Sequence, residues 1–318
     1  MTVAGISLDP KMVWLFGGVT ALLVLASLIG FALSRAVTSE TGQATVRNLN
    51  ARIKAWWGMV AVFAVAFTFG KIVTILLFAL VSFYCLREFI SLTPTRPADH
   101  RAIVVAFYFF IPYQYWLVSI GWVTMLTIGI PVFAFLLLPV LSVTKGETDD
   151  FLQRTAKIQW ALMLTVFCIS HAPALLILNI PGYQNFYLLF FLVTVVQLSD
   201  VLQYVFGKLF GRHKVAPKVS PSKTVEGLVG GGLAATGIGA ALWWITPFTP
   251  LAAAAMPAAA IVAAGFLGGL VLSAVKRSLG AKDWGTMIEG HGGALDRMDS
   301  VSFAAPLFFH LVNYYYTV

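Results

Sequence analysis

The sequence predicts an all-α fold, a polytopic integral membrane bundle of about ten transmembrane helices. Hydrophobic residues make up 59% of the 318 residues and charged residues only 11%, whereas soluble domains carry about 25% charged residues. Apolar runs also recur along the whole chain, and a membrane-spanning helix needs about 20 predominantly apolar residues. Lipid rather than water is therefore expected to surround most of the surface.

Ten apolar segments approach the length of a membrane span. They lie at roughly residues 12–33, 55–70, 72–90, 102–118, 120–142, 159–180, 186–207, 225–247, 250–275 and 299–317. The second, third and fourth segments are short or interrupted by Lys71 and Pro112. The number of spans between residues 55 and 118 is therefore open.

The basic residues predict the orientation of these spans. If the first helix runs inward, all Lys and Arg residues except Lys11 and Lys71 fall on the cytoplasmic side, where loops of membrane proteins are enriched in them. Both termini are then expected outside the cytoplasm. The net charge of +8 follows from the same rule, so no nucleic-acid partner is expected.

Polar and ionisable residues concentrate after residue 197. We therefore divide the chain into N-terminal membrane helices (residues 1–180) and a C-terminal catalytic membrane domain (residues 181–318) whose polar residues face the cytoplasm. The first cluster lies in the seventh span, where Gln197, Asp200 and Tyr204 share one helical face. A carboxylate inside a membrane costs about 2.5–3.5 kcal/mol, which leaves two interpretations of Asp200, a functional metal ligand or a structural ion pair.

The second cluster is the basic loop from Lys208 to Glu226, rich in Lys, Arg and Pro. Such a loop presents positive charge to an anion at the membrane surface, and Lys223 is its candidate for binding a substrate. Thr224 is expected to cap the next helix. The alternative interpretation is that the loop only follows the charge rule for cytoplasmic loops.

The third cluster spans residues 273–299, which connect the last two predicted spans. Its polar and glycine positions are Ser273, Lys276, Arg277, Lys282, Asp283, His291, Gly292, Gly293, Asp296, Arg297 and Asp299. Carboxylates of this kind suit Mg²⁺, which takes one or two of them together with substrate phosphates and water. The cations would hold phosphates, and Gly292 and Gly293 would let the backbone approach them closely. His291 is expected to be a hydrogen-bond donor or proton shuttle, or else a structural histidine, since Mg²⁺ does not favour imidazole.

The stretch SAVKRSLGAKDWGTMIEGHGGALDRMD, residues 273–299, resembles the signature of the phosphatidate cytidylyltransferase (CDP-diglyceride synthetase) family. That signature has Ser, Lys-Arg, Lys-Asp and His-Gly-Gly in this order, followed by two aspartates that flank an arginine. Upstream, VSPSKTVEG resembles another family stretch, and Asp200 stands where the family keeps an aspartate. The resemblance covers roughly residues 187–318, with departures at Gln203, Ser222 and Glu289 that leave the substrate open.

The resemblance implies a nucleotidyltransferase that converts CTP and phosphatidic acid to CDP-diacylglycerol and pyrophosphate in the bacterial inner membrane. It implies Mg²⁺, alone or with a second cation, held by Asp200, Asp283, Asp296 and Asp299. Lys282 and His291 join Asp283, Asp296 and Asp299 as the expected catalytic residues. The expected substrate-binding residues are Ser220, Lys223, Ser273, Lys276, Arg277, Gly292, Gly293 and Arg297. The partners are thus the two substrates and membrane lipid, and a homodimer is compatible with the sequence.

Three alternatives are weighed against this expectation. A divergent paralogue would use another nucleotide or another lipid phosphate. A CDP-alcohol phosphatidyltransferase would show Asp-Gly-x-x-Ala-Arg followed by spaced aspartates, which the sequence lacks. A lipid or ion transporter without chemistry would place its site at the membrane midplane between repeats, and no internal repeat is visible.

Overall fold

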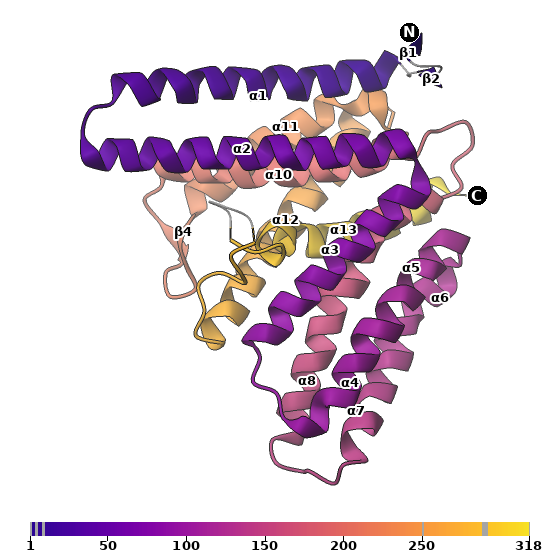
Figure 1. Ribbon diagram of the computed structural model, residues 1–318. Coiled ribbons are helices and arrows are strands. Elements are labelled where there is room, and N and C mark those ends of the chain that lie inside the picture. The colour runs from indigo at the N-terminus through magenta and orange to yellow at the C-terminus, as the bar shows by residue number, and fades with distance from the viewer. Residues whose placement is uncertain (1, 4–5, 8–9, 250, 288–291, 318) are drawn as a thin grey trace. The chain divides into compact units, whose positions relative to one another are not determined.

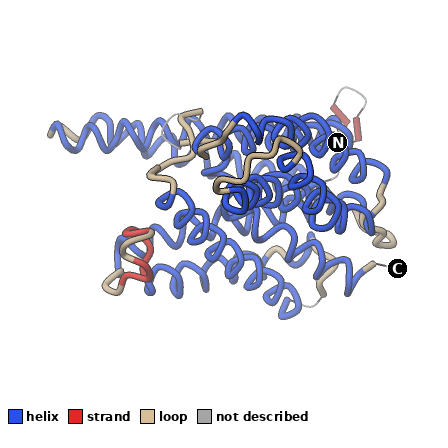
Figure 2. The backbone as a smooth tube through the Cα atoms, turned by 90° about the horizontal axis from the view of Figure 1, so that it is seen from below, coloured by secondary structure: helices blue, strands red, loops and turns tan. Residues whose placement is uncertain are grey.

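The computed structural model describes residues 2–3, 6–7, 10–249, 251–287 and 292–317, and most of them are helical (Figures 1 and 2). The predicted all-α fold class is confirmed. The chain forms two compact units. One comprises Met1–Gly70 and Thr286–Gly292, and the other comprises Lys71–Gly285 and Gly293–Val318.

The first unit is a helical hairpin. Strands β1 (Thr2–Val3) and β2 (Ile6–Ser7) pair antiparallel and precede helices α1 (Pro10–Ala36) and α2 (Glu40–Phe69). The indole Nε1 of Trp57 in α2 donates a hydrogen bond of 3.1 Å to Ser27 Oγ in α1. Helix α2 begins at Glu40, well before the predicted span at residue 55.

The second unit begins with the helices that follow Gly70. They are α3 (Lys71–Leu92), η1 (Pro97–Asp99), α4 (His100–Val105), η2 (Ala106–Phe110), α5 (Ile111–Ile120), α6 (Val123–Ile128), η3 (Gly129–Ala134), α7 (Phe135–Val143), α8 (Phe151–Leu162), η4 (Met163–Cys168), α9 (Ile169–Ala174) and η5 (Leu175–Ile177). The segments η2, η3 and η4 are π-helical and η1 and η5 are 3₁₀ turns. Each π-helical segment continues the helix before it, so three long spans result.

The second unit ends with the elements that carry the polar clusters. They are α10 (Phe186–Phe210), β3 (Lys214–Ala216), β4 (Ser220–Thr224), η6 (Gly227–Gly231), α11 (Gly232–Ala241), η7 (Trp243–Ile245), α12 (Leu251–Ser278) and α13 (Leu295–Tyr316). Strands β3 and β4 form an antiparallel hairpin within the predicted basic loop.

Eight helices of the described residues are long and apolar enough to cross a membrane, which confirms a multi-pass membrane protein. Two of the ten predicted spans do not reach this measure. The apolar helix Gly227–Ala241 is too short, and α13 is not among the eight.

The contacts divide the chain into compact units after Gly70. Helix α13 packs against both α9 and α3 as well as against α10 and α12. The division at residue 180 remains a prediction about where the function lies.

Helices α12 and α13 pack closely through glycines. A Cβ atom added at Gly268 would lie 2.7 Å from the backbone oxygen of Asp299, and one at Gly265 would touch Ser300. Small residues allow such close helix contact in membranes. This packing brings the first turns of α13 against the middle of α12.

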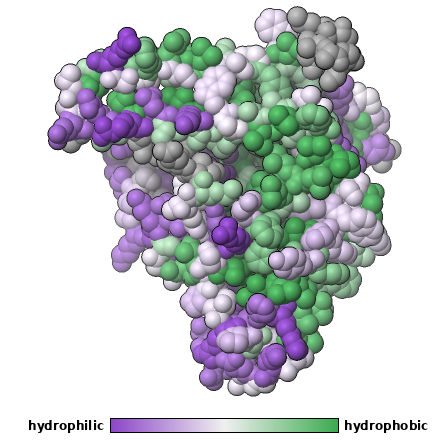
Figure 3. All heavy atoms as spheres, in the orientation of Figure 1, coloured by the Kyte–Doolittle hydropathy of each residue, from purple (hydrophilic) through white to green (hydrophobic). Residues whose placement is uncertain are grey.

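Charged side chains gather at one end of the second unit, where the loops after α3 and α7 lie (lower tip in Figures 1 and 3). Arg154 of α8 is buried there and forms a salt bridge of 3.1 Å with Asp99, whose side chain is 1% exposed. Arg96 pairs with Glu147 at 2.8 Å nearby. The buried pair fixes the start of α4 to the start of α8.

We expect Asp99→Ala to lower the free energy of unfolding by about 3–5 kcal/mol, because it leaves the buried Arg154 charge without its closest carboxylate. The control is Asp149→Ala, which removes a carboxylate whose side chain is 79% exposed and should cost at most about 1 kcal/mol. Thermal unfolding of the purified proteins in detergent compares the two. Equal melting temperatures for both variants would contradict the assigned role of Asp99.

Candidate active site

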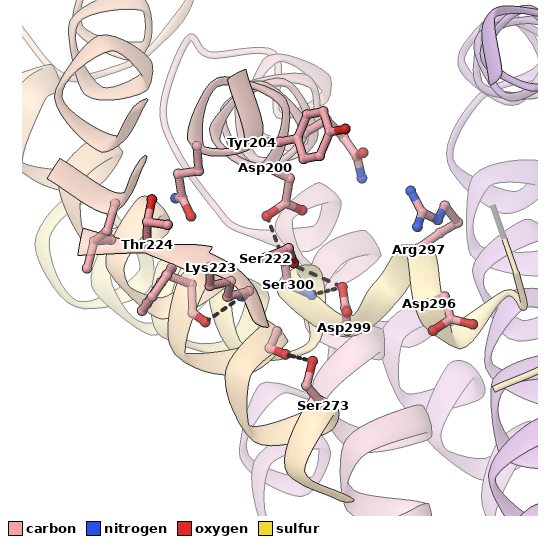
Figure 4. Close-up of a pocket in the computed structure, with 15 residues that line it drawn as sticks. Asp200, Tyr204, Ser222, Lys223, Thr224, Ser273, Asp296, Arg297, Asp299 and Ser300 are labelled. Atoms are coloured by element: carbon pink, nitrogen blue, oxygen red, sulfur yellow. Dashed lines mark hydrogen bonds between the residues drawn. The ribbon is translucent and has the colours of Figure 1, made fainter. Parts of the chain in front are cut away.

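A cavity of about 220 Å³ lies among α10, β4, η6, α12 and α13 in the second unit (Figure 4). Its lining side chains and glycine are Gln197, Asp200, Gln203, Tyr204, Ser222, Lys223, Thr224, Leu228, Phe266, Gly269, Ser273, Asp296, Arg297, Asp299 and Ser300. Residues from all three predicted clusters therefore meet in one place, although 68 residues of chain lie between the first cluster and the third.

Helix α10 contributes one wall. Gln197, Asp200 and Tyr204 line the cavity because spacings of three and four residues bring side chains to one helical face. Gln203 also lines it and is held by a hydrogen bond of 2.6 Å from its Nε2 to Ser199 Oγ. The shared face predicted from the sequence is confirmed.

Two carboxylates, those of Asp200 and Asp299, face the same hydroxyl group. Ser300 Oγ lies 3.1 Å from Asp200 Oδ1 and 3.5 Å from Asp299 Oδ1, and the Ser300 backbone N–H donates to Asp299 Oδ1 at 2.7 Å. One hydroxyl donates only one proton at a time. Among the described residues the two carboxylates therefore share a single side-chain donor, and their other oxygens accept no hydrogen bond there.

Neither Asp200 nor Asp299 forms a salt bridge within the described part of the chain: no basic nitrogen there lies within 4.0 Å of either carboxylate. The structural ion pair considered for Asp200 is thus not formed. A membrane carboxylate without such a pair is costly, which favours the functional interpretation.

Lys223 approaches the carboxylates from β4. Its Nζ donates to the Phe266 carbonyl oxygen at 3.2 Å and lies 4.6 Å from the centre of the Phe266 ring. Burial lowers the pKa of Lys223, while the charges of Asp200 and Asp299 oppose that shift. A Cβ at Gly269 would lie 2.7 Å from Lys223 Nζ, so this glycine gives the ammonium group its space.

Asp296 has a different environment from Asp299. Its Oδ1 forms a buried salt bridge of 2.6 Å with Lys276 Nζ, and its Oδ2 accepts the backbone N–H groups of Trp284 and Gly293 at 2.8 and 2.9 Å. Both oxygens are engaged. Asp296 therefore anchors the segment before α13, and Lys276 balances its charge.

The remaining predicted site residues lie in several places. Ser273 lines the cavity and donates to the Gly269 carbonyl oxygen at 2.6 Å, and Arg297 lines it with a buried Nε that has no hydrogen-bond partner among the described residues. The predicted residues that do not line the cavity are Ser220, Lys276, Arg277, Lys282, Asp283, Gly292 and Gly293. Lys282 and Asp283 are exposed. His291 lies outside the described residues.

Only some of the predicted aspartates are placed to bind a magnesium ion together. The described residues contain no group of three or more His, Cys, Asp or Glu side chains placed to hold a metal, so the predicted set of four aspartates does not come together there. Asp200 and Asp299 do meet across Ser300, and Mg²⁺ is commonly held by one or two carboxylates plus substrate phosphates. This pair fits such a site.

Comparison with known proteins decides the family. The model of the cytidylyltransferase family matches residues 50–315. The chain belongs to this family. Its members are nucleotidyltransferases, so the chain is an enzyme of phospholipid synthesis, and the transporter alternative is not supported.

Individual relatives agree with the family. Over 300 residues the chain is 39% identical to the uncharacterized protein YnbB of Escherichia coli K12, covering 92% of this chain and 96% of that protein. It is 38% identical over 134 residues to a phosphatidate cytidylyltransferase of Staphylococcus saprophyticus, covering 39% of this chain and 48% of the relative. It is 34% identical over 161 residues to the enzyme of that name from Staphylococcus haemolyticus, with 48% and 60% covered. The matches to the two staphylococcal enzymes thus span about half of each relative.

The loop that carries Lys223 in this cytidylyltransferase is fixed at its base. Thr224 Oγ1 accepts the Gly227 backbone N–H at 3.1 Å, so the predicted cap is confirmed. Glu226 accepts the backbone N–H groups of Arg212 and His213 and lies 2.6 Å from His213 Nδ1. Hydrogen bonding, chiefly from the His213 side chain, lowers the pKa of Glu226 to about 2. The carboxylate therefore stays charged and holds the two ends of the loop together.

Sequence reasoning did not single out Ser300 and Phe266. Ser300 follows Asp299 directly, so its place beside the third cluster was a signal that could have found it. Phe266 sits in an apolar run of α12, and its contact with Lys223 arises only from the packing of β4 on α12. No local pattern predicts it.

Proposed function

We propose that this cytidylyltransferase forms CDP-diacylglycerol and pyrophosphate from CTP and phosphatidic acid with Mg²⁺. The observation that carries the proposal is the cavity where Asp200 and Asp299 face Lys223 and Arg297. Carboxylates that can hold a divalent cation stand there beside cations that can hold phosphates, and the helices around them are those of a membrane protein.

The reaction requires little covalent chemistry from the protein. A phosphate oxygen of the lipid attacks the α-phosphorus of CTP, a new P–O bond forms, and the bond to the bridging oxygen of the β-phosphate breaks so that pyrophosphate leaves. The attacking oxygen is already anionic, so the step needs no strong general base. Phosphoryl-type transfer depends mainly on positioning and charge stabilisation.

The side chains of the cavity divide this work. Asp200 and Asp299 would hold Mg²⁺, which when bound screens the negative charge of the nucleotide phosphates. Lys223 and Arg297 supply positive charge for the lipid phosphate and the leaving pyrophosphate. Ser300 keeps both carboxylates oriented through its hydroxyl and its backbone N–H.

A second candidate substrate pair is another nucleotide or another lipid phosphate. Ser222 and Gln203, two positions that depart from the family pattern, both line the cavity beside Lys223 and Asp200. Neutral polar groups at these positions can alter which headgroup or base is accepted.

Purified protein in detergent, given phosphatidic acid, Mg²⁺ and each nucleoside triphosphate in turn, tests the proposal. With CTP, we expect pyrophosphate release to be at least about 100-fold faster in the presence of Mg²⁺ than in its absence, because two polyanions cannot approach without charge screening. Faster release with a different nucleotide would favour the second candidate. No release with any nucleotide or lipid phosphate would contradict both.

The variant Asp200→Asn distinguishes a metal-binding role of Asp200 from a structural role. If Asp200 holds the cation, turnover should fall by about two orders of magnitude or more, since a ligand charge is lost. The melting temperature without Mg²⁺ should stay level or rise, because like charges near each other repel. The exposed Asp149→Asn is the matched control. A variant that melts lower yet turns over normally per folded molecule would return Asp200 to a structural role.

We further propose that the protein lies in the bacterial inner membrane with the cavity toward the cytoplasm. The loop of Lys223 and the segment after Ser273 meet at one cavity, so these two basic segments lie on one side, and basic loops face the cytoplasm.

Single cysteines in a background without Cys85 and Cys168 test this orientation. A cysteine at position 43 or 216 should be protected from a membrane-impermeant thiol reagent in cells with a permeabilised outer membrane and an intact inner membrane. A cysteine at Gln184, in the loop expected on the other side, should react and serves as the control. Labelling of position 216 in those cells would overturn the orientation.

A further inference from the structure

Glu88 of α3 contacts the segment that begins α13. Its Oε1 accepts the backbone N–H of Ala294 and its Oε2 accepts that of Leu295, both at 2.8 Å. The first N–H groups of a helix have no partner within the helix, and a carboxylate is favoured there by the helix dipole. Glu88 thus binds the start of α13 from more than 200 residues away in the sequence.

The backbone around Glu88 is shaped to admit its carboxylate. A Cβ at Gly293 would lie 2.4 Å from Glu88 Oε2, and one at Gly285 would lie 2.8 Å from Glu88 Oε1. Side chains at either position would displace the carboxylate. The two glycines therefore form a cradle for Glu88, which gives Gly293 a role other than contact with a substrate phosphate.

A second contact joins α3 to the same segment. The ring of Phe89, next to Glu88, stacks on the Trp284 ring with centroids 4.9 Å apart and an interplanar angle of 19°. Trp284 is 1% exposed, and its backbone N–H is bound by Asp296. Helix α3 thus contacts Trp284 through an aromatic ring and the start of α13 through a carboxylate.

We propose that Glu88 is a positioning residue for catalysis: it fixes the first turn of α13 so that Arg297 and Asp299 face Asp200. Leu295 precedes Asp299 by one helical turn, and Ser300, which links the two carboxylates, follows directly. A rotation or shift of this first turn moves all three side chains together. The proposal rests on the proposed function for its kinetic part, and on the geometry of α13 alone for its structural part.

The first experiment compares Glu88→Gln with wild type in detergent. The amide keeps the size but points an NH₂ donor at one of the two backbone donors. We expect hydrogen exchange of the amides in residues 293–300 to become about 10-fold faster or more, since one hydrogen bond is replaced by a clash. We expect kcat to fall by about 10- to 100-fold, because small misplacements of reacting groups cost this much, while KM for CTP changes less than about threefold.

Glu147→Gln is the matched control. Glu147 also has a carboxylate, which forms a salt bridge with Arg96 and does not line the cavity. It should leave kcat and the exchange of residues 293–300 unchanged. Glu88→Gln with unchanged exchange and unchanged kcat would overturn the proposal, as would a fall in kcat that only mirrors the loss of folded protein.

A double-variant comparison tests the cradle. Gly293→Ala should reduce kcat in the wild type by crowding Glu88, but should have little further effect in Glu88→Ala, where no carboxylate remains to be displaced. Gly237→Ala, at a helical glycine with nothing within 4 Å, is the control substitution. Equal losses from Gly293→Ala in both backgrounds would assign Gly293 to the substrate and contradict the cradle.

The two proposals fail in different ways. Absence of turnover in the wild type with every nucleotide counts against the proposed function, and the hydrogen-exchange comparison still decides whether Glu88 holds α13. Normal wild-type turnover with unaffected Glu88 variants counts against the positioning role alone.

Discussion

Two carboxylates that form no salt bridge among the described residues, placed inside a helical membrane protein, are the constraint on which the rest of the site depends. Each carboxylate at membrane depth costs about 2.5–3.5 kcal/mol by the insertion scale. Ser300 and its backbone N–H compensate only part of this for Asp200 and Asp299. Lys223 lies near but gives its hydrogen bond to the Phe266 carbonyl. Both carboxylates are therefore left able to bind a cation.

Glycine packing makes this arrangement possible. An added Cβ at Gly231 would lie 2.4 Å from the backbone N of Gln203, and one at Gly227 would lie 2.6 Å from the Gln203 carbonyl oxygen. These contacts bring η6 and β4 against the cavity wall of α10, as Gly268 brings α12 against α13. In lipid, helices associate through such close contacts because no hydrophobic driving force brings them together. The late glycines of the sequence thus determine how near Lys223 and Asp299 come to Asp200.

Much of the site could be predicted from sequence because its patterns are local. Gln197, Asp200 and Tyr204 share a face through helical spacing, and Thr224 caps the next helix as its position indicates. What the sequence could not predict depends on packing between distant segments. The pairing of Asp296 with Lys276, the contact of Phe266 with Lys223 and the hold of Glu88 on α13 all cross between elements. Of the ten predicted spans, those at residues 225–247 and 299–317 are not among the eight helices of the described residues that are long and apolar enough to cross a membrane.

The aspartates of the third cluster then have separate roles that residue type alone could not assign. Asp283 is exposed, Asp296 is neutralised by Lys276, and only Asp299 faces Asp200 across Ser300. Once the Asp296 pair is set aside, the charged side chains of the lining are two carboxylates and two cations, Lys223 and Arg297. Such a lining is close to neutral, whereas a nucleoside triphosphate and a lipid phosphate together bring several negative charges. A divalent cation that enters with the nucleotide and binds the carboxylates would supply the positive charge that the proposed reaction needs here. The proposed magnesium requirement therefore follows from the charge of the cavity as well as from the kind of ligands it offers.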